Sequence, residues 1–398
     1  MRNKLKFSNK MQTNIRNIKF SKSIQPAFIE LLRERVNTYF KENRISKQGN
    51  SKMTLKTIIM FSLFLIPYLL MIFNVFSGII PYYILWLTIG IGMAGIGLSV
   101  MHDANHGSYS KNRKLNNRLG YSLNMLGGNS FLWKIQHNYL HHAFTNIENV
   151  DDDINVPLFL RFSPNSQKHW IQRFQHVYVW LFYALSTLSW VTTKNFFQFF
   201  SYRKKELIRD NQELKKELIK EIIWKLIYYF FLLVLPILLL PIPVWTVVTA
   251  FILMHIVIGL ILSVIFQPAH IMPTSHFPLP DDKGKIENSW AIHQLLTTCD
   301  FSLKSRFFSW FIGGLNFQIE HHLFPNICHI HYPAIAGIVK RTAQEYNISY
   351  HVHPTFFQAI KSHMKMLRYL GKHNQLNTNN NLNSKLTSVL GLRLKNQT

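Results

Sequence analysis

Cysteine is scarce in this sequence of 398 residues. It occurs only as Cys299 and Cys328, and this wide spacing matches no metal-binding pair. Cysteine-based zinc sites and iron–sulfur clusters need several thiolates, and disulfide frameworks need paired cysteines. The sequence therefore argues against all three, and any metal site must use other side chains.

Acidic residues are also scarce. The chain has 19 Asp and Glu against 44 Lys and Arg, which gives a formal net charge of +25. Such an excess is typical of proteins that bind nucleic acid and of membrane proteins that face an anionic cytoplasmic leaflet. Composition alone does not choose between these two classes, so the placement of the charges must decide.

A secretory signal peptide is not visible. Residues 1–56 have no early apolar core and no small-residue cleavage site, and they carry 14 Lys and Arg against 3 acidic residues. We expect a basic N-terminal arm, cytoplasmic or interfacial, over residues 1–56. Within it, Phe28, Leu31, Leu32 and Val36 recur at helical spacing across residues 27–40. This pattern predicts either an amphipathic helix lying on the membrane or a solvated tail.

Charge is almost absent from four long apolar runs. Proline or glycine separates the first from the second, and the third from the fourth: residues 57–77, 79–100, 222–240 and 244–266. Each run has roughly the 20 residues that cross a hydrocarbon core. The sequence therefore predicts an all-α integral membrane protein with four transmembrane helices in two hairpins, 57–100 and 222–266. Two adjacent uncharged runs argue against a buried soluble hairpin.

Single residues within these runs carry further expectations. Gly90, Gly92, Gly95 and Gly97 lie at small-residue spacing in the second run, which predicts close helix packing. His255 lies in the middle of the fourth run. We expect it to be a neutral, hydrogen-bonded histidine that faces the helix bundle, although an ionisable residue within a membrane span always raises a functional question.

Most of the positive charge lies in the polar segments outside the hairpins. These are residues 101–221, residues 267–373 and a loose C-terminal tail over 374–398. Neither hairpin turn contains Lys or Arg, so the positive-inside rule places the turns outside and the polar segments and both termini on the cytoplasmic face. The net charge is then explained by the membrane, and no nucleic acid partner is expected.

Histidine is unusually frequent, with 19 residues. His102 and His106 are four residues apart; His137, His141 and His142 form a second group; Gln318, His321 and His322 form a third. On helices, such spacing directs side chains to one face. Neutral imidazole binds iron, copper, zinc and nickel, and this many candidates exceed the needs of one ion. The sequence predicts a cytoplasmic helical region with a His-rich site for two metal ions.

Acidic residues lie beside these groups. They are plausible partners that orient the imidazole rings, by accepting the proton of the second ring nitrogen: Asp103, Glu148, Asp151, Asp152, Asp153 and Glu320. For the run of three aspartates, a solvated turn or helix cap is an alternative interpretation.

A shared metal site also constrains the topology. If residues 177–193, which are uncharged, crossed the membrane, the third histidine group would lie about 30 Å from the first two. We therefore expect residues 177–193 to form an interfacial helix, with Trp180, Tyr183 and Trp190 at the level of the lipid headgroups.

The three groups together resemble the three histidine boxes of the membrane fatty acid desaturases, over roughly residues 55–341. The resemblance implies a centre of two non-haem iron ions with dioxygen as co-substrate, and it adds His270, just after the last span, to the ligands. The implied metal ligands are His102, His106, His137, His141, His142, His270, Gln318, His321 and His322. Gln318 in the third box resembles the front-end type, which inserts a double bond between the carboxyl end and an existing double bond.

The resemblance also implies the substrate and the partners. We expect an acyl-CoA or acyl-lipid substrate, held in an apolar slot that the aromatic residues of 307–317 could form. No His-Pro-Gly-Gly haem signature occurs and the N-terminal arm is too short for a fused cytochrome b5 domain. A separate electron donor, cytochrome b5 or ferredoxin with its reductase, is therefore expected. The protein would lie in a bacterial inner membrane, or in the endoplasmic reticulum of a eukaryote.

Three alternatives stay open at this stage. A hydroxylase or ketolase with the same histidine boxes would share the oxidant and differ only in the fate of the substrate radical. A metal transporter would place its ligands near the middle of the bilayer, where only His255 lies. A basic membrane adaptor would explain the charge but not the histidine groups.

Overall fold

Helices dominate the computed structural model, which describes residues 15–21 and 25–373. Regular strands in this part are two residues long and pair in parallel: β1 (Lys19–Phe20) with β2 (Lys285–Ile286), and β3 (Asp300–Phe301) with β4 (Val352–His353). The predicted helical class is confirmed. The predicted tail, 374–398, lies outside the described residues.

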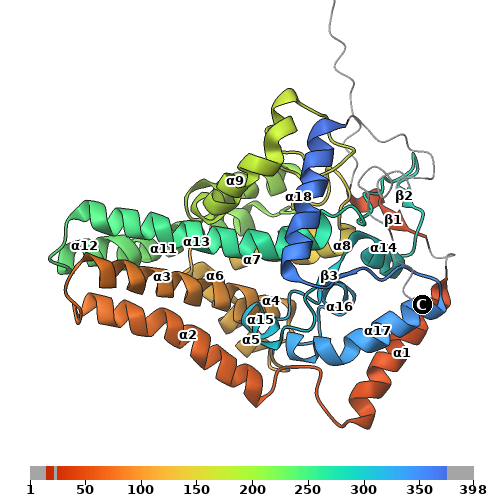
Figure 1. Ribbon diagram of the computed structural model, residues 1–398, viewed down its shortest axis with the longest axis horizontal. Coiled ribbons are helices and arrows are strands. Elements are labelled where there is room, and N and C mark those ends of the chain that lie inside the picture. The colour runs from red at the N-terminus through yellow and green to blue at the C-terminus, as the bar shows by residue number, and fades with distance from the viewer. Residues whose placement is uncertain (1–14, 22–24, 374–398) are drawn as a thin grey trace, which may run out of the picture.

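Four helices are long and apolar enough to cross a membrane. They are α2 (Ser51–Ile72), the continuous α3 to α4 (Ile79–His106), the continuous α11 to α12 (Asn211–Leu239) and α13 (Val244–His270). In the most apolar 18-residue stretch of each helix, only 28% of the residues of α2 and 22% of those of α11–α12 are buried inside the protein. Large apolar faces therefore remain exposed, as a multi-pass membrane protein requires. The four helices extend together toward one end of the molecule (Figure 1).

Each helix is longer than the uncharged run that predicted it. The helix α2 begins at Ser51 because the side chain of Asn50 accepts a hydrogen bond from the backbone N–H of Lys52. The helix α11 (Asn211–Tyr229) begins in the charged segment and continues through η6 (Phe230–Val234) into α12 (Leu235–Leu239). The predicted boundary between residues 221 and 222 thus marks a change of composition within one helix.

Small residues allow close contacts between the long helices. A Cβ atom on Gly92 of α3 (Ile79–Gly95) would lie 2.6 Å from the backbone nitrogen of Phe64 in α2. A Cβ on Gly259 of α13 would lie 2.5 Å from the carbonyl oxygen of Ala184 in α9 (Gln175–Ser189). The predicted close packing of the second apolar run is confirmed at Gly92, whereas Gly97 has no atom within 4 Å of such a position.

The segment predicted to be interfacial forms α9, which continues through η5 (Trp190–Lys194) into α10 (Asn195–Lys204). It packs along α13 and is not one of the four candidate spans in the described chain. One expectation was wrong: Tyr183 does not face headgroups. Its side chain is buried and its hydroxyl lies 2.7 Å from Nε2 of His363 in α18 (Phe356–Lys372).

The helix predicted in the N-terminal arm is present as α1 (Pro26–Glu42). Its apolar side chains Phe28, Leu32, Val36 and Phe40 are buried in one cluster with α17 (Tyr332–Glu345). Neither the membrane-surface helix nor the solvated tail describes this arrangement. The apolar face packs on the protein's own C-terminal part, because α17 supplies a complementary apolar face far along the chain.

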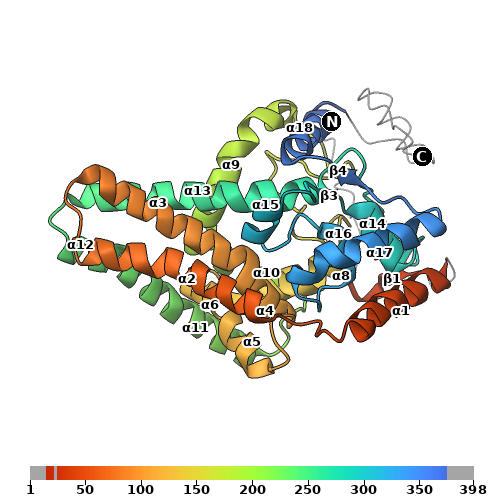
Figure 2. The same cartoon turned by 60° about the horizontal axis from the view of Figure 1, so that its bottom comes forward.

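The shorter elements gather where the long helices α3–α4 and α13 end (Figures 1 and 2). They are η1 (Ile15–Asn17), η2 (Ile96–Met101), α4 (His102–His106), α5 (Arg113–Gly120), α6 (Ser122–Met125), α7 (Ser130–Trp133), η3 (Lys134–His141), α8 (His142–Phe144), α14 (Trp290–Thr297), α15 (Arg306–Phe311), α16 (Gln318–Leu323) and η7 (His329–His331). The short η4 (Trp170–Phe174) packs instead on α18 and α9. Two of the short elements, η2 and η3, are π-helical.

Candidate metal centre

The three predicted histidine groups meet at the end of the helix bundle. The helix α4 brings the first group, η3 and α8 bring the second, α13 ends at His270, and α16 brings the third. Every predicted ligand is buried except His106, which is half-buried. Residues more than 200 positions apart, such as His102 and His322, therefore share one interior site.

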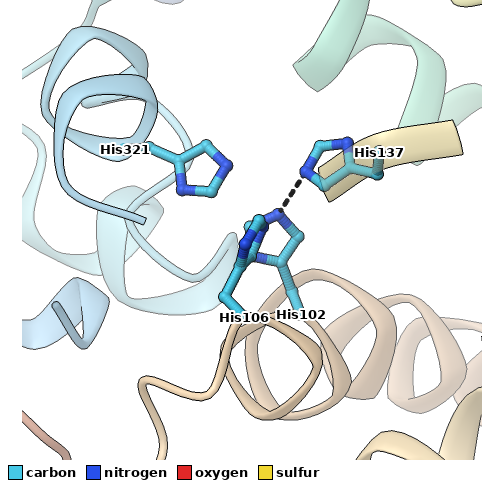
Figure 3. A group of neighbouring side chains, drawn as sticks. All are labelled: His102, His106, His137 and His321. Atoms are coloured by element: carbon cyan, nitrogen blue, oxygen red, sulfur yellow. Dashed lines mark hydrogen bonds between the residues drawn. The ribbon is translucent and has the colours of Figure 1, made fainter. Parts of the chain in front are cut away.

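Four imidazoles form the first cluster: His102, His106, His137 and His321, whose ligand nitrogens lie within 4.8 Å of one another. Figure 3 shows them converging from three separate elements. The Nε2 atoms of His102 and His137 are 3.2 Å apart. Two nitrogens bound to one ion by bonds of about 2.1 Å lie about 3.0–3.4 Å apart. The cluster therefore has the spacing of ligands that share an ion.

The second cluster consists of His141, His270 and His322, again with ligand nitrogens within 4.8 Å. His142 lies between the clusters, with its ring centroid 4.5 Å from that of His321 and 4.3 Å from that of His322. Gln318 is buried beside this cluster, and its amide nitrogen has no hydrogen-bond partner. All nine predicted ligands are thus brought together.

The π-helical form of η3 explains how the second histidine group serves both clusters. A π-helix bonds residue i to residue i+5, so side chains five apart share a face. The Nε2 atoms of His137 and His142 lie 3.2 Å apart as a result. The segment is anchored at its start by Asn129, which caps Leu132 and donates to the carboxylate of Glu221 in α11.

The outer nitrogen of several rings contacts a polar group. Nδ1 of His141 lies 3.1 Å from a carboxylate oxygen of Asp151, and Nδ1 of His321 lies 3.1 Å from the hydroxyl of Tyr332. Two further pairs are His322 Nδ1 with Gln294 Oε1 at 2.9 Å, and His270 Nδ1 with the carbonyl of Thr297 at 3.3 Å. The oxygens of Asp151, Gln294 and Thr297 accept, so these three contacts hold a proton on Nδ1 of their rings. In His270 and His322 this leaves the lone pair of Nε2 directed at the cluster.

Burial sets the charge state of the rings. It lowers the pKa of His137, His142, His321 and His322 well below the usual value, and repulsion among neighbouring rings lowers it further. Burial also disfavours the charged form of His141, but Asp151 and Asp153 outweigh it and raise the pKa of His141 to about 9. Most of the cluster is therefore neutral imidazole, the form that binds metals.

The donor set fits transition-metal ions. The Nε2 atoms of His106, His270, His321 and His322 are buried and have no hydrogen-bond partner. Buried polar atoms without partners are rare in proteins because they cost free energy. An ion bound in each cluster would give these nitrogens the partner they lack. Transition-metal ions that prefer nitrogen ligands fit a set of neutral imidazoles.

Comparison with known proteins agrees with this site. Residues 78–354, which include every candidate ligand, match the family described as fatty acid desaturase. The chain belongs to this family. It is 35% identical over 350 residues to the acyl-lipid (8-3)-desaturase of Physcomitrium patens, covering 86% of this chain and 72% of the relative. It is also 35% identical to the sn-1 linoleoyl-lipid 6-desaturase of Synechocystis sp., covering 89% of this chain and 98% of the relative.

The protein is thus a fatty acid desaturase, an oxidoreductase of lipid metabolism, as the sequence predicted. A third relative, the sn-1 linoleoyl-lipid 6-desaturase of Arthrospira platensis, is 33% identical over 90% of this chain and 96% of the relative. The names of these relatives are consistent with the predicted front-end type. The transporter and adaptor alternatives are excluded by this membership.

The acidic residues beside the boxes of this desaturase have unequal roles. Asp151 and Asp153 contact His141, and Asp103 lies 4.0 Å from Nδ1 of His102. The other predictions were wrong: Asp152 pairs with Lys205, Glu148 lies beside Ser163, and Glu320 accepts from Tyr350 and pairs with Asp300. Adjacency in sequence did not decide orientation: Glu148 and Asp152 lie in turns after α8, and Glu320 lies in α16 beside His321, yet all three have other partners.

Several residues at the site had no signal in the sequence. Gln294, Thr297 and Tyr332 contact the rings but lie in no recognisable motif. Trp133 packs at a tilt against His137 with ring centroids 4.4 Å apart, and Phe266 packs against His102 and His137. Residues 307–317 were expected to form an acyl slot, but the first and last of them do not line one. Phe307 is 77% exposed, and Phe317 is buried in the cluster that joins α1 and α17.

Proposed function

We propose that this desaturase uses two non-haem iron ions and dioxygen to insert a double bond into the acyl chain of a membrane lipid. The convergence of imidazoles from three distant boxes into two adjacent clusters carries this proposal. When bound, the iron pair supplies the oxidising power to remove hydrogen from unactivated methylene groups, which amino-acid side chains lack.

The two clusters support an assignment of the ligands. His102, His106, His137 and His321 would hold one ion, and His141, His270 and His322 the other. His142, between the clusters, would serve one or both, and Gln318 would complete the second position. The protein's part is to keep most of these imidazoles neutral, to orient them through Asp151, Tyr332 and Gln294, and to bury them away from bulk water.

The net reaction requires an external reductant. The substrate gives up two hydrogen atoms, and dioxygen is reduced to two water molecules with two further electrons and two protons. A separate protein, cytochrome b5 or ferredoxin with its reductase, would supply the electrons.

The substrate assignment is supported by the relatives. Those in Synechocystis and Arthrospira are named for action on a linoleoyl-lipid at position 6, and the moss relative is named an acyl-lipid desaturase. We infer that this chain acts on an acyl-lipid rather than acyl-CoA. The Gln318 of the third box and these names together favour insertion between the carboxyl end and an existing double bond.

The topology follows from the shared site. Two hairpins, α2 with α3 and α11–α12 with α13, would return the chain to the cytoplasmic face each time, with α9 lying at the membrane surface. This arrangement is supported by the lack of Lys and Arg in residues 73–78 and 240–243. The metal clusters and both termini would then be cytoplasmic.

Expression in a host with defined lipids tests the function. Methyl esters of the host fatty acids, separated by chromatography, should contain a new polyunsaturated species, and the purified protein should hold two irons. Replacing His141 or His322 with Ala should abolish the product and lower the iron content. The variant His176→Ala, on α9 and outside both clusters, should retain both. Full activity of either cluster variant, or a hydroxylated product, would contradict the proposal.

A further inference from the structure

A second polar cluster lies beside the first metal position and joins one residue of the first histidine box to two residues outside the boxes. It joins Lys56 of α2, Asp103 of α4 and His329 of η7, with exposures of only 2%, 1% and 3%. The Nζ atom of Lys56 is 2.7 Å from Nε2 of His329, and Nδ1 of His329 is 2.8 Å from Oδ2 of Asp103. Three segments far apart in the chain therefore meet in one buried hydrogen-bonded chain.

The chemistry of Lys56 fixes which groups donate and which accept along this series of hydrogen bonds. An ammonium group only donates hydrogen bonds, so Nε2 of His329 must accept and its Nδ1–H must donate to Asp103. The backbone N–H of His329 donates to the same oxygen of Asp103 at 3.2 Å. Oδ2 of Asp103 is thus occupied twice, whereas Oδ1 lies 4.0 Å from Nδ1 of His102.

This cluster is not built as a third metal site. Asp103, Cys328 and His329 lie close enough together to hold an ion. However, both ring nitrogens of His329 are already hydrogen-bonded, one of them to the ammonium of Lys56. The same ammonium lies 5.2 Å from the ring centroid of Trp310. A cation at this position repels a second cation, so the hydrogen-bonded arrangement excludes the metal.

The second metal position contains a simpler version of the same arrangement. There, Asp151 contacts Nδ1 of His141 directly, through both carboxylate oxygens at 3.1 and 3.2 Å. A carboxylate behind a metal-binding imidazole fixes its orientation and strengthens it as a ligand. At the first position Asp103 is the corresponding carboxylate, 4.0 Å from Nδ1 of His102. His329 donates to its other oxygen, and Lys56 donates to His329.

We propose that Lys56 and His329 are positioning residues for the first metal position, acting through Asp103 on His102. The inference rests on the proposed function, because it requires ions at the two clusters. Stability is a weak reason for such a network, since buried ion pairs usually contribute little net stability over apolar residues of similar size. The oxygen of Asp103 that faces His102 gives the network its specific role.

Metal binding by the purified full-length protein in detergent tests this inference. The metal-free protein is titrated with Fe²⁺ without oxygen, and with Co²⁺ as a probe whose absorption reports its ligands. The wild type should bind two ions. In His329→Leu and in Lys56→Met, one ion should bind about 10- to 100-fold more weakly while the other keeps its affinity.

Matched variants separate the positions. Asp151→Asn should weaken the other ion, so combining it with His329→Leu should weaken both. His331→Gln lies on the same turn as His329 but contacts the carbonyl of Gln48 instead, and it should bind both ions normally. The conservative Lys56→Arg, which still donates to His329, should restore much of the affinity that Lys56→Met loses.

The possible results are distinct. Unchanged affinity for both ions in His329→Leu and Lys56→Met would overturn the inference. Equal loss of both ions together with a lower unfolding temperature would also overturn it, because it would show a merely structural role. If the wild type itself bound no ions at the clusters, the proposed function would fail, and this inference with it.

Discussion

Buried histidines in this desaturase fall into two kinds, which differ in how many ring nitrogens have partners. In His255 both nitrogens are engaged, by the hydroxyls of Tyr228 at 2.6 Å and Thr187 at 3.1 Å. The expected hydrogen-bonded histidine within the fourth span is therefore confirmed. The rings of His321 and His322 instead keep Nε2 without a partner. Several unpartnered buried nitrogens that converge, as these do, are thus the residue-scale mark of a candidate metal site.

His363 belongs to the fully engaged kind and yields a prediction about pH. Its Nε2 contacts the hydroxyl of Tyr183, its Nδ1 contacts the carbonyl of Ile271, and burial lowers the pKa of His363 to about 4. Because the folded pKa lies below the unfolded value of about 6.5, the unfolded chain binds the extra proton between these values. The neutral, hydrogen-bonded His363 therefore contributes its full share to the free energy of unfolding above about pH 6.5, and this share is lost as pH falls toward 4.

The measurement is the unfolding temperature of the metal-free protein in detergent across this pH range. At pH 7, His363→Leu should be less stable than the wild type, and the difference should shrink by up to about 3 kcal/mol as pH falls to 4. Tyr183→Phe removes the hydrogen bond to His363 but keeps the imidazole that titrates, so the pH dependence should remain. A difference that stays constant with pH would contradict this account.

At the scale of elements, helix geometry brings the candidate ligands to their places. The π-helices η2 and η3 lie directly before His102 and around His137. Such segments are uncommon and often lie at functional sites. The long helices also approach each other closely, and Gly259 of α13 lies against backbone atoms of α9.

Gly259 and Gly97 offer a matched pair of substitutions. In Gly259→Ala the new Cβ would meet two backbone carbonyls of α9, at 2.5 and 2.6 Å, which cannot move without shifting the helix. This variant should lose about 1–3 kcal/mol of stability. Gly97→Ala has open space and should be neutral or slightly stabilising. Thermal unfolding of both variants checks the prediction, and equal stability of the two would contradict the tight crossing of α9 and α13.

The whole molecule has the long helices at one end and, at the other, the short helices α4, α8 and α16 that carry the three histidine groups (Figure 1). The exposed faces of α2 and α11–α12 suit contact with lipid, and the excess of 44 Lys and Arg over 19 acidic residues suits an anionic membrane surface. An even number of crossings between the second and third histidine boxes is needed for one site, and this requirement makes the topology testable.

Labelling of single cysteines tests that topology. A cysteine at Asn74 or Pro241, in the two turns between long helices, should react with a membrane-impermeant maleimide from outside intact cells. A cysteine at Lys111, between α4 and α5, should react only after the membrane is opened. The native Cys299 and Cys328 are buried and should contribute little background. Equal labelling at Lys111 and Asn74 in intact cells would contradict the proposed crossing of α2–α3.

Sequence alone determined the membrane class, the four apolar helices and the nine candidate ligands, because each depends on local composition or on a short motif. It did not reveal α1 packing on α17, the buried Tyr183, or the partners Tyr332 and Gln294, because these contacts join distant segments that carry no mutual signal. For the same reason, the contact of Lys56 with His329 and of His329 with Asp103 could not be predicted from the sequence. Tertiary structure decided which imidazoles share a cluster and what stands behind each ring, since only folding brings those atoms within bonding distance.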